Sequence, residues 1–309
     1  MSFSSKQSSS HSPGRSIVPW YVALVLLAAI FWACYRFFIH SKLGQWIDEA
    51  ALLGGETFLK ADKARGPALA FLDYMPVASA LLAGIFILIA VLRRRDVLQP
   101  AVAGALLLGA TGSTQLFKHV VLDRPDLNIS GASMNSFPSG HTTFAAAAMA
   151  AIFIVAPMDK RPPMALLGWL YAAIAGASTL VLGWHRPSDV IGAYLVVAWW
   201  SVLAGLFLRH AHGNDPDRAP AAFRPNPLSQ TLLRFLAATG ALAAAAALAL
   251  AAVMPHPAIG TLQKGPLLVF LAVGLVLVVG MAMATGLVVH ELFSRYGAPI
   301  RRRLVRGMK

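Results

Sequence analysis

The chain is poor in charged residues and in cysteine. Only 13% of its 309 residues are Asp, Glu, Lys or Arg, whereas 57% are hydrophobic and the mean hydropathy is +0.64. Soluble domains carry about 25% charged residues, so the composition excludes an ordinary soluble fold. Cys34 is the single cysteine, which excludes an internal disulfide and a cysteine metal site.

Long apolar runs are abundant instead. About 20 helical residues cross a hydrocarbon layer of ~30 Å, and runs of this length recur along the chain. The first is too long for a cleavable signal peptide and lacks a small-residue cleavage site. The predicted fold class is an all-α membrane protein, a six-helix transmembrane core bundle plus two extra C-terminal transmembrane helices. The eight predicted spans are residues 18–39, 75–92, 98–117, 141–157, 163–182, 189–208, 232–254 and 266–290.

The net charge of +13 reflects a shortage of acidic residues, 13 against 26 basic ones. Such an excess is also typical of nucleic-acid-binding proteins, but its placement points to a membrane. If the N-terminus is cytoplasmic, the cytoplasmic segments hold 17 of the 26 basic residues, as the positive-inside rule requires. We therefore expect a multi-pass protein of a bacterial inner membrane, with both termini in the cytoplasm and no nucleic-acid partner.

The core is predicted to occupy residues 17–208, after a Ser-rich, disordered cytoplasmic tail at 1–16. It includes an interfacial segment at 41–74, which we expect to form one or two helices on the outer face, broken at Gly54-Gly55 and Gly66-Pro67.

The C-terminal part follows a proline-containing cytoplasmic linker at 209–231. Residues 232–309 are predicted to hold the last two spans and a basic tail. The apolar runs LAAAAALALAAVM and VFLAVGLVLVVGMAMATGLVV contain no titratable residue. We therefore expect this pair of helices to serve packing or partner contact.

Polar side chains interrupt the apolar runs in three places, and the predicted topology puts all three on the outer face. The first place ends the third span, TGSTQLFKHVVLDRPD. Thr111, Thr114, Gln115 and Lys118 follow the i, i+3, i+4, i+7 spacing, which predicts one stripe on that helix facing the bundle interior. Arg124 follows. Lys118 alone would be interpreted as a side chain that reaches the membrane surface.

The second place is NSFPSGHTTFA, residues 135–145. A Pro-Ser-Gly turn before a helix predicts an anion cradle, because the unpaired N–H groups and the dipole of the helix start favour negative charge. Gly140 permits close approach of a ligand, and Ser139 offers a hydroxyl. His141 can give or take a proton. In isolation, however, Ser139 is equally typical of an ordinary helix cap.

The third place is STLVLGWHRPSDV, residues 178–190. Pro187 suits the first turn of the sixth span, which leaves His185 just outside that helix and puts Asp189 in its first turn. This geometry lets the carboxylate bind one imidazole nitrogen and leaves the other as a nucleophile. For either residue alone, a helix cap beside an interfacial histidine is the simpler interpretation.

Together the three places indicate phosphoryl transfer. Cations and backbone N–H groups can bind phosphate oxygens. One histidine can act as the nucleophile, the carboxylate can orient it, and the other histidine can act as a general acid. A metal site from His141, His185 and Asp189 is the main chemical alternative. The neighbouring cations would repel a metal ion, so we expect no metal and no cofactor.

These clusters resemble the signature of the type 2 phosphatidic acid phosphatase family, in its membrane lipid phosphatase branch, which is related to the vanadium haloperoxidases. The family pattern is Lys-x6-Arg-Pro, then Pro-Ser-Gly-His, then Ser-Arg-x5-His-x3-Asp, and the resemblance covers about residues 17–208. It implies metal-free dephosphorylation through a phosphohistidine on His185, oriented by Asp189, with His141 protonating the leaving oxygen. It also implies that the phosphate is held by Lys118, Arg124, Ser139 and Gly140.

Two positions depart from this pattern. Lys118 and Arg124 are one residue too close, and Thr179 stands where the family has its second arginine. We hypothesise that Arg186 replaces that arginine, since its guanidinium can reach a phosphate at His185. Otherwise Arg186 extends to lipid headgroups and Thr179 marks weakened catalysis.

The predicted function is hydrolysis of a lipid phosphate or diphosphate at the extracytoplasmic membrane face. The predicted partners are this lipid and the bilayer. One alternative is a phosphotransferase that passes the phosphoryl group to a lipid or a glycan. Another, from a different class, is a binder or transporter of lipid phosphates that has lost turnover.

Overall fold

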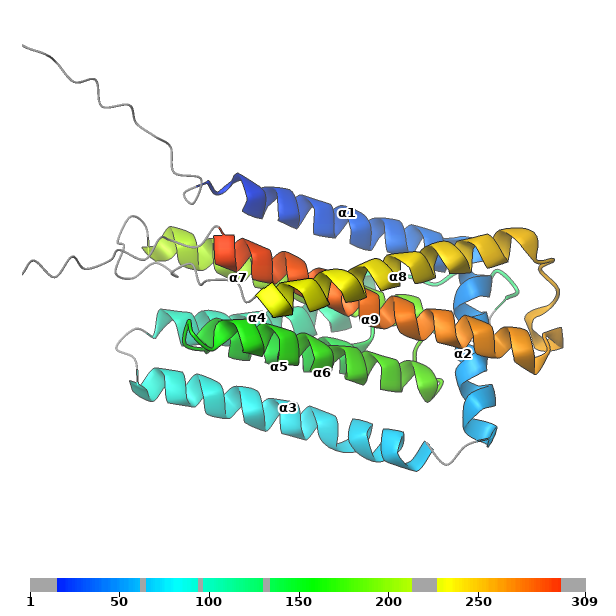
Figure 1. Ribbon diagram of the computed structural model, residues 1–309, viewed down its shortest axis with the longest axis horizontal. Coiled ribbons are helices and arrows are strands. Elements are labelled where there is room, and N and C mark those ends of the chain that lie inside the picture. Colours follow the sequence, from blue (N-terminus) through cyan, green and yellow to red (C-terminus); the bar gives the residue numbers. More distant parts are fainter. Residues whose placement is uncertain (1–15, 62–64, 94–96, 130–133, 213–226, 296–309) are drawn as a thin grey trace, which may run out of the picture.

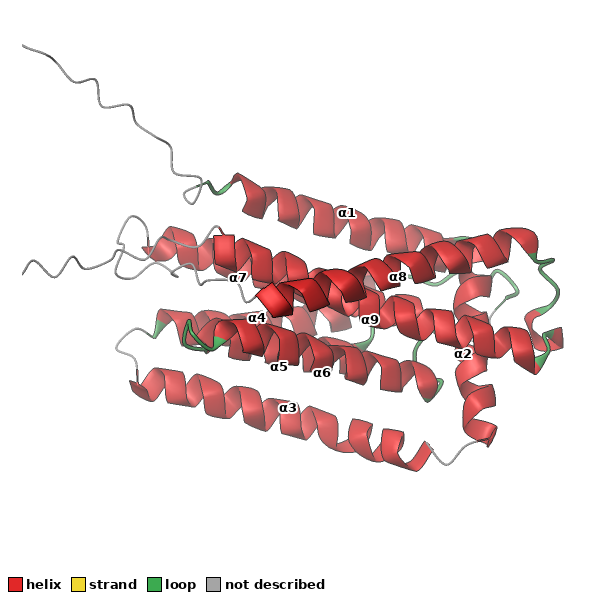
Figure 2. Ribbon diagram, viewed as in Figure 1, coloured by secondary structure: helices red, strands yellow, loops and turns green. Residues whose placement is uncertain are grey.

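The computed structural model describes residues 16–61, 65–93, 97–129, 134–212 and 227–295 (Figure 1). Helices joined by loops make up this part of the chain, and it contains no strand (Figure 2). The helices are α1 Val18–His40, α2 Lys42–Ala61, α3 Arg65–Arg93, α4 Leu98–Leu116, α5 Gly140–Val155, α6 Arg161–Val181, α7 Pro187–His212, α8 Pro227–Val253 and α9 Lys264–Arg295, with a π-helical turn η2 at Phe117–Val121 and a 3₁₀ turn η3 at Ile259–Thr261.

Six of these helices are long and apolar enough to cross a membrane: α1, α3, α6, α7, α8 and α9. The other two predicted spans are also helical, as α4 and α5. α4 has 19 residues and carries polar groups near its end, whereas α5 has 16 residues and packs against α3, α4, α6 and α7. The prediction of an all-α membrane protein with two extra C-terminal spans is confirmed.

α2 lies across one end of the bundle rather than along it (Figure 1). The predicted break at Gly54-Gly55 is wrong, because α2 runs through both residues. These glycines instead let helices approach closely: a β-carbon on Gly54 would overlap the backbone of α9, and one on Gly55 the backbone of α6. Gly66 and Pro67 fall in the first turn of α3, where proline is tolerated. Residues 62–64 lie outside the described part.

The C-terminal helices belong to the same bundle as the other helices. α9 packs against α2, α6 and α7 as well as α8. α8 and α9 cross closely at Gly240 and Gly280, where added side-chain carbons would collide with the facing backbone, a pattern typical of membrane helix pairs. The predicted tail at 1–16, the middle of the linker at 209–231 and the basic C-terminal end fall largely or wholly outside the described residues.

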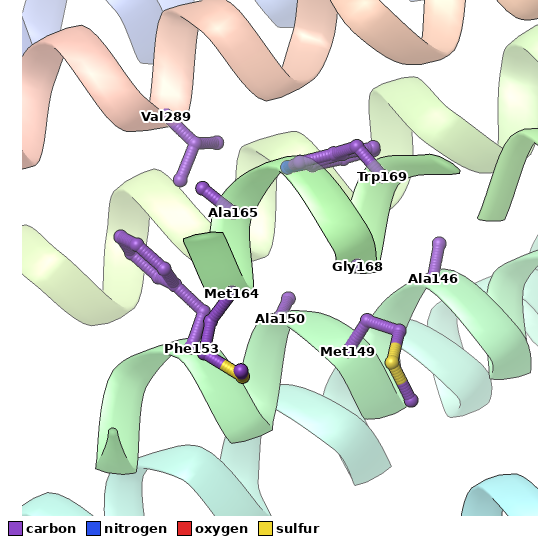
Figure 3. Close-up of a pocket in the computed structure, with 9 residues that line it drawn as sticks. All are labelled: Ala146, Met149, Ala150, Phe153, Met164, Ala165, Gly168, Trp169 and Val289. Carbon is purple, nitrogen blue, oxygen red and sulfur yellow. The ribbon is translucent and has the colours of Figure 1, made fainter. Parts of the chain in front are cut away.

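The bundle is tightly packed where α5, α6 and α9 meet. Figure 3 shows a void there, lined by apolar side chains that include Phe153, Trp169 and Val289. Its volume is about 10 Å³, close to the smallest space that can hold one water molecule. Binding chemistry is therefore not expected at this place.

The polar stripe at the end of the third span is not one regular helix. α4 ends at Leu116 and the chain continues as the π-helical turn η2, which carries Lys118. Thr114 is fully buried and its hydroxyl lies 3.0 Å from that of Thr143 in α5, whereas Gln115 is exposed. The predicted stripe therefore continues into a π turn at Lys118, and the prediction that it faces the bundle interior is wrong at Gln115, which is exposed. Such turns are frequent at functional sites.

Candidate active site

The segment from His185 to Asp189 joins α6 to α7 at the end of the bundle that α2 covers. α7 begins at Pro187, and Asp189 lies in its first turn. His185 therefore precedes the helix, as predicted. Its side chain is 8% exposed and that of Asp189 is fully buried.

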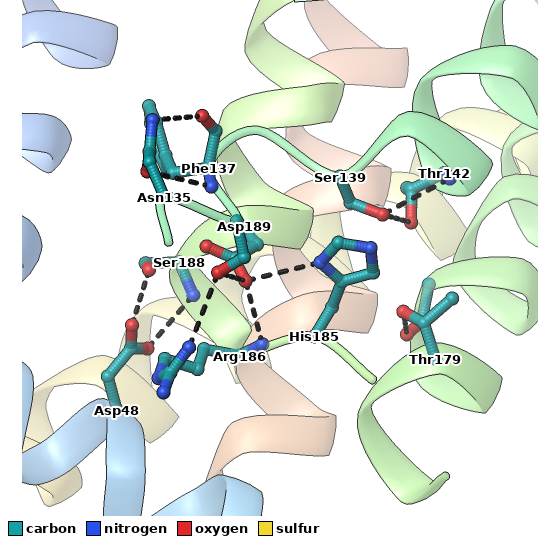
Figure 4. A network of polar contacts seen from close by, with 12 residues as sticks. Asp48, Asn135, Phe137, Ser139, Thr142, Thr179, His185, Arg186, Ser188 and Asp189 are labelled. Atoms are coloured by element: carbon teal, nitrogen blue, oxygen red, sulfur yellow. Dashed lines mark hydrogen bonds and ion pairs between the residues drawn. The ribbon is translucent and has the colours of Figure 1, made fainter. Parts of the chain in front are cut away.

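The predicted contact between the imidazole and the carboxylate is present. Nδ1 of His185 lies 3.2 Å from Oδ2 of Asp189. The same oxygen accepts hydrogen bonds from the hydroxyl of Ser136 (2.7 Å) and from the backbone N–H of Arg186 (3.1 Å). In Figure 4 the other ring nitrogen of His185 points toward Ser139 and Thr142. The arrangement fixes the carboxylate and leaves the second imidazole nitrogen available for chemistry.

The end of α6 sets the position of His185. The carbonyl of Thr179 accepts the backbone N–H groups of Trp184 (2.9 Å) and His185 (3.2 Å), and Gly183 supplies the left-handed residue, with φ of +69°, that ends many helices. The Thr179 hydroxyl is buried and donates to the carbonyl of Gly176 at 2.8 Å. Thr179 thus contributes backbone geometry to the site but no charge.

The PSGH turn is tied directly to α7. The backbone N–H of Ser139 donates to the carbonyl of Asp189 at 2.8 Å, and the Ser139 hydroxyl accepts the N–H of Thr142 at 3.4 Å as the cap of α5. Gly140 is the first residue of α5. His141 follows it, and its ring centroid lies 5.5 Å from that of Trp184. His141 is also close enough to His185 and Lys118 to interact electrostatically with both.

Lys118 and Arg124 interact electrostatically with the site, Lys118 with His141 and Arg124 with Arg186 and Asp189. Asn135 joins them to the PSGH turn, because its amide donates to the carbonyls of Leu122 (3.1 Å) and Phe137 (3.0 Å). Both terminal nitrogens of Arg124 are buried without a hydrogen-bond partner among the described residues. Burial and the nearby Arg186 cation lower the pKa of Arg124. Buried donors of this kind call for a partner, and a bound anion would supply one.

Arg186 points to α2 rather than to open space. Its Nε and Nη2 atoms lie 2.8 and 2.6 Å from Oε2 of Glu49, and Nη1 donates to the hydroxyl of Ser136 at 3.3 Å. Arg186 is 4% exposed, so it does not extend to lipid headgroups. The hypothesis that it contacts a phosphate at His185 stays a prediction.

Sequence reasoning missed three residues of this network: Asp48, Glu49 and Ser136. Asp48 is fully buried, and its carboxylate accepts the backbone N–H of Ser188 at 3.0 Å and also the Ser188 hydroxyl. Burial and the neighbouring Asp189 raise the pKa of Asp48 to about 7. The only sequence signal was an Asp-Glu pair among apolar residues in QWIDEAALL, which is also typical of an interfacial helix. Among the described residues, no three His, Cys, Asp or Glu side chains are arranged to hold a metal.

Fold and site together define a multi-pass membrane protein with a His–Asp pair and nearby cationic side chains at one end of its helical bundle. Residues 100–213 match the model of the PAP2 superfamily, and this part of the chain is a PAP2 superfamily domain. The match contains all eight predicted site residues, from Lys118 to Asp189.

Two relatives agree with this assignment. Proteins named lipid A 1-phosphatase from Rhizobium johnstonii and Rhizobium etli are each 35% identical to the chain over 75 residues. The aligned stretch is 24% of this chain and 29% and 30% of the relatives, so it spans less than a third of their length. No solved structure matches the chain.

Proposed function

We propose that the protein hydrolyses the phosphate or diphosphate group of a membrane lipid without a metal ion, through a phosphohistidine on His185. The observation that carries the proposal is the contact between Nδ1 of His185 and Asp189, whose carboxylate oxygen is fixed by two further donors. An imidazole held this way presents its second nitrogen as a nucleophile with a defined tautomer and direction.

The reaction would proceed in two displacements at phosphorus. In the first, Nε2 of His185 forms a bond to phosphorus, the bond to the lipid oxygen breaks, and His141 gives that oxygen a proton. In the second, a water molecule loses a proton to His141 and attacks phosphorus. The phosphorus–nitrogen bond then breaks, which releases phosphate and restores His185.

The charge of the phosphoryl group would be balanced by the groups around His185. Lys118 and Arg124 supply cations, and Arg124 has two buried nitrogens that lack a partner among the described residues. The start of α5 at Ser139 and Gly140 supplies N–H groups and the positive end of the helix dipole. Arg186 would add Nη1, while Glu49 holds the other edge of its guanidinium.

The substrate is proposed to be a lipid exposed on the extracytoplasmic face, such as a polyprenyl diphosphate, a phosphatidylglycerophosphate or a phosphatidate. The name of the two relatives, lipid A 1-phosphatase, supports a phosphorylated lipid as the substrate class. The excess of basic residues in the other loops supports the orientation.

The test is phosphate release by the purified protein from a panel of these lipids, with and without EDTA. Activity should survive EDTA and be inhibited by orthovanadate, which mimics five-coordinate phosphorus. Loss of activity in EDTA that a divalent ion restores would favour a metal mechanism. Specific binding of the lipids with no release would favour the alternative that the buried Thr179 supports, a lipid-phosphate binder without turnover.

A further inference from the structure

A second apolar space lies beside the segment from His185 to Asp189, and α7 is the one helix in its walls that belongs to the PAP2 match. It has a volume of about 400 Å³ and is walled by α1, α2, α7, α8 and α9, within the usual range of roughly 300–1,000 Å³ for ligand pockets. α1 packs against α7 and α2, whereas α8 packs against α9. The cavity lies between these two groups of helices.

Three of the walls turn regular helix faces toward the cavity. α9 contributes Phe270, Val273, Gly274, Leu277 and Met281, which follow the i, i+3, i+4, i+7, i+11 spacing of one face. α1 contributes a similar face between residues 30 and 38, and α8 one between residues 244 and 248. Small residues in these walls leave the space that larger side chains would fill.

The lining permits a hydrocarbon ligand and little else. Asp48 is its one charged residue among those described, and both carboxylate oxygens of Asp48 are bonded to Ser188. A ligand with polar groups inside the cavity would leave them without partners, at a considerable free-energy cost. The walls therefore favour an alkyl chain.

The length of the cavity matches one leaflet of a bilayer. Eleven residues separate Phe270 from Met281 on α9, which corresponds to about 16 Å at 1.5 Å per residue. The hydrocarbon core is ~30 Å thick, so half of it has nearly this depth. The end at Phe270 is the end nearer α2, because the ring of Phe270 lies 5.3 Å from that of Trp46 on α2. At this end an interfacial helix is expected to meet the headgroups.

The cavity also reaches the segment from His185 to Asp189. Pro187, which lies between His185 and Asp189 in the sequence, forms part of its wall, and a β-carbon on Gly274 would lie 3.1 Å from the ring of Pro187. We propose that this cavity holds one acyl chain of the lipid substrate while its phosphate lies at His185. The sequence predicts only packing or partner contact for α8 and α9. With an acyl chain in this cavity, α8 and α9 also select the substrate by the length of that chain. This role rests on the proposed phosphatase function.

The test uses the full-length protein in liposomes and two substitutions on neighbouring positions of α8. Ala244→Trp fills the cavity, because Ala244 lines it. Ala245→Trp is the matched control, because Ala245 is exposed and lies outside the lining. Phosphate release is measured for dihexanoyl, didodecanoyl and dihexadecanoyl phosphatidic acid. Ala244→Trp should lower kcat/KM for the longest lipid by about 10-fold or more, the scale of a changed hydrophobic pocket, and leave the dihexanoyl lipid nearly unchanged.

A second readout does not depend on turnover. A phosphatidic acid with a diazirine in one acyl chain should crosslink to Val273 or Leu277, and Ala244→Trp but not Ala245→Trp should remove this crosslink. Identical chain-length profiles in Ala244→Trp and the wild type, or crosslinks at these positions that Ala244→Trp leaves unchanged, would overturn the inference. If the wild type releases no phosphate from any lipid but keeps the Ala244-dependent crosslink, the phosphatase proposal fails and the chain site stands.

Discussion

Three polar groups converge on Oδ2 of Asp189: the imidazole of His185, the hydroxyl of Ser136 and the backbone N–H of Arg186. An asparagine at this position keeps the shape but favours the wrong imidazole tautomer. Asp189→Asn should therefore lower kcat by about 10²–10⁴-fold, as measured by phosphate release at saturating lipid. Ser136→Ala, which removes one of the three donors, should have a smaller effect. Near wild-type kcat in Asp189→Asn would contradict the orienting role.

The position of Arg186 leads to a separate prediction. If its Nη1 edge stabilises the transition state, Arg186→Ala should lower kcat/KM by about 10²-fold or more, the scale of losing one preorganised donor. Thr179→Arg in that background should restore part of the loss by returning a guanidinium to the position that the family uses.

Loss of Arg186 also leaves Glu49 as a buried carboxylate without its ion pair, which destabilises a protein. The Arg186→Ala/Glu49→Gln double variant separates the two effects, because it removes the unpaired charge. Steady-state kinetics that stay unchanged in this double variant would show that Arg186 only anchors α2.

At the scale of elements, α2 lies outside the matched domain but contacts the segment from His185 to Asp189. Asp48 and Glu49, on neighbouring positions of α2, bind Ser188 and Arg186, the two residues that flank Pro187. α2 therefore acts as a clamp on the beginning of α7. Its glycines allow this by bringing its backbone against α6 and α9.

The clamp predicts a dependence of stability on pH. Burial and Asp189 raise the pKa of Asp48 from 3.8 to about 7, so the folded protein binds a proton there more tightly than the unfolded chain does. Between about pH 4 and about pH 7, Asp48 is ionised in the unfolded chain but still protonated in the folded protein. The free energy of unfolding therefore falls progressively as the pH rises through this interval. Asp48→Asn should remove this loss, so its unfolding temperature in detergent should rise relative to the wild type over that interval. A constant difference between the two proteins would contradict the shifted pKa.

The elements differ in how far the sequence predicts them. Hydropathy predicts the six long apolar helices of the described residues and the shorter α4 and α5, because each carries its own signal. Pro187 predicts the position of His185 just outside α7. The roles of Asp48 and Glu49 could not be predicted, because their partners are 140 and 137 residues away in the sequence. The sequence predicts a regular helix at Lys118, since nothing in FKHVV distinguishes a π turn from an α turn. The sequence predicts a break at Gly54 and Gly55 because close helix packing and helix termination both favour glycine.

At the scale of the whole molecule, the site lies at one end of the bundle, and α1 begins and α9 ends at the other. The beginning of α1 and the end of α9 are at the end away from α2 (Figure 1). With the termini in the cytoplasm, the site would face outward. In a Cys34→Ala background, Met134→Cys, which replaces an exposed residue near the PSGH turn, should react with an impermeant thiol reagent in intact cells. Reaction only after permeabilisation would invert the orientation and indicate inner-leaflet substrates.

The phosphohistidine is the central claim, and trapping it is the most direct measurement. The wild type should be mixed with a lipid carrying a radioactive phosphate, quenched within a turnover and digested for mass spectrometry. We predict an acid-labile, base-stable label on His185 that forms in the presence of EDTA, is absent from His185→Ala and forms more slowly in His141→Ala, where the leaving oxygen lacks its proton donor. Turnover by His185→Ala at a rate near that of the wild type, or a label on any other residue, would contradict the account.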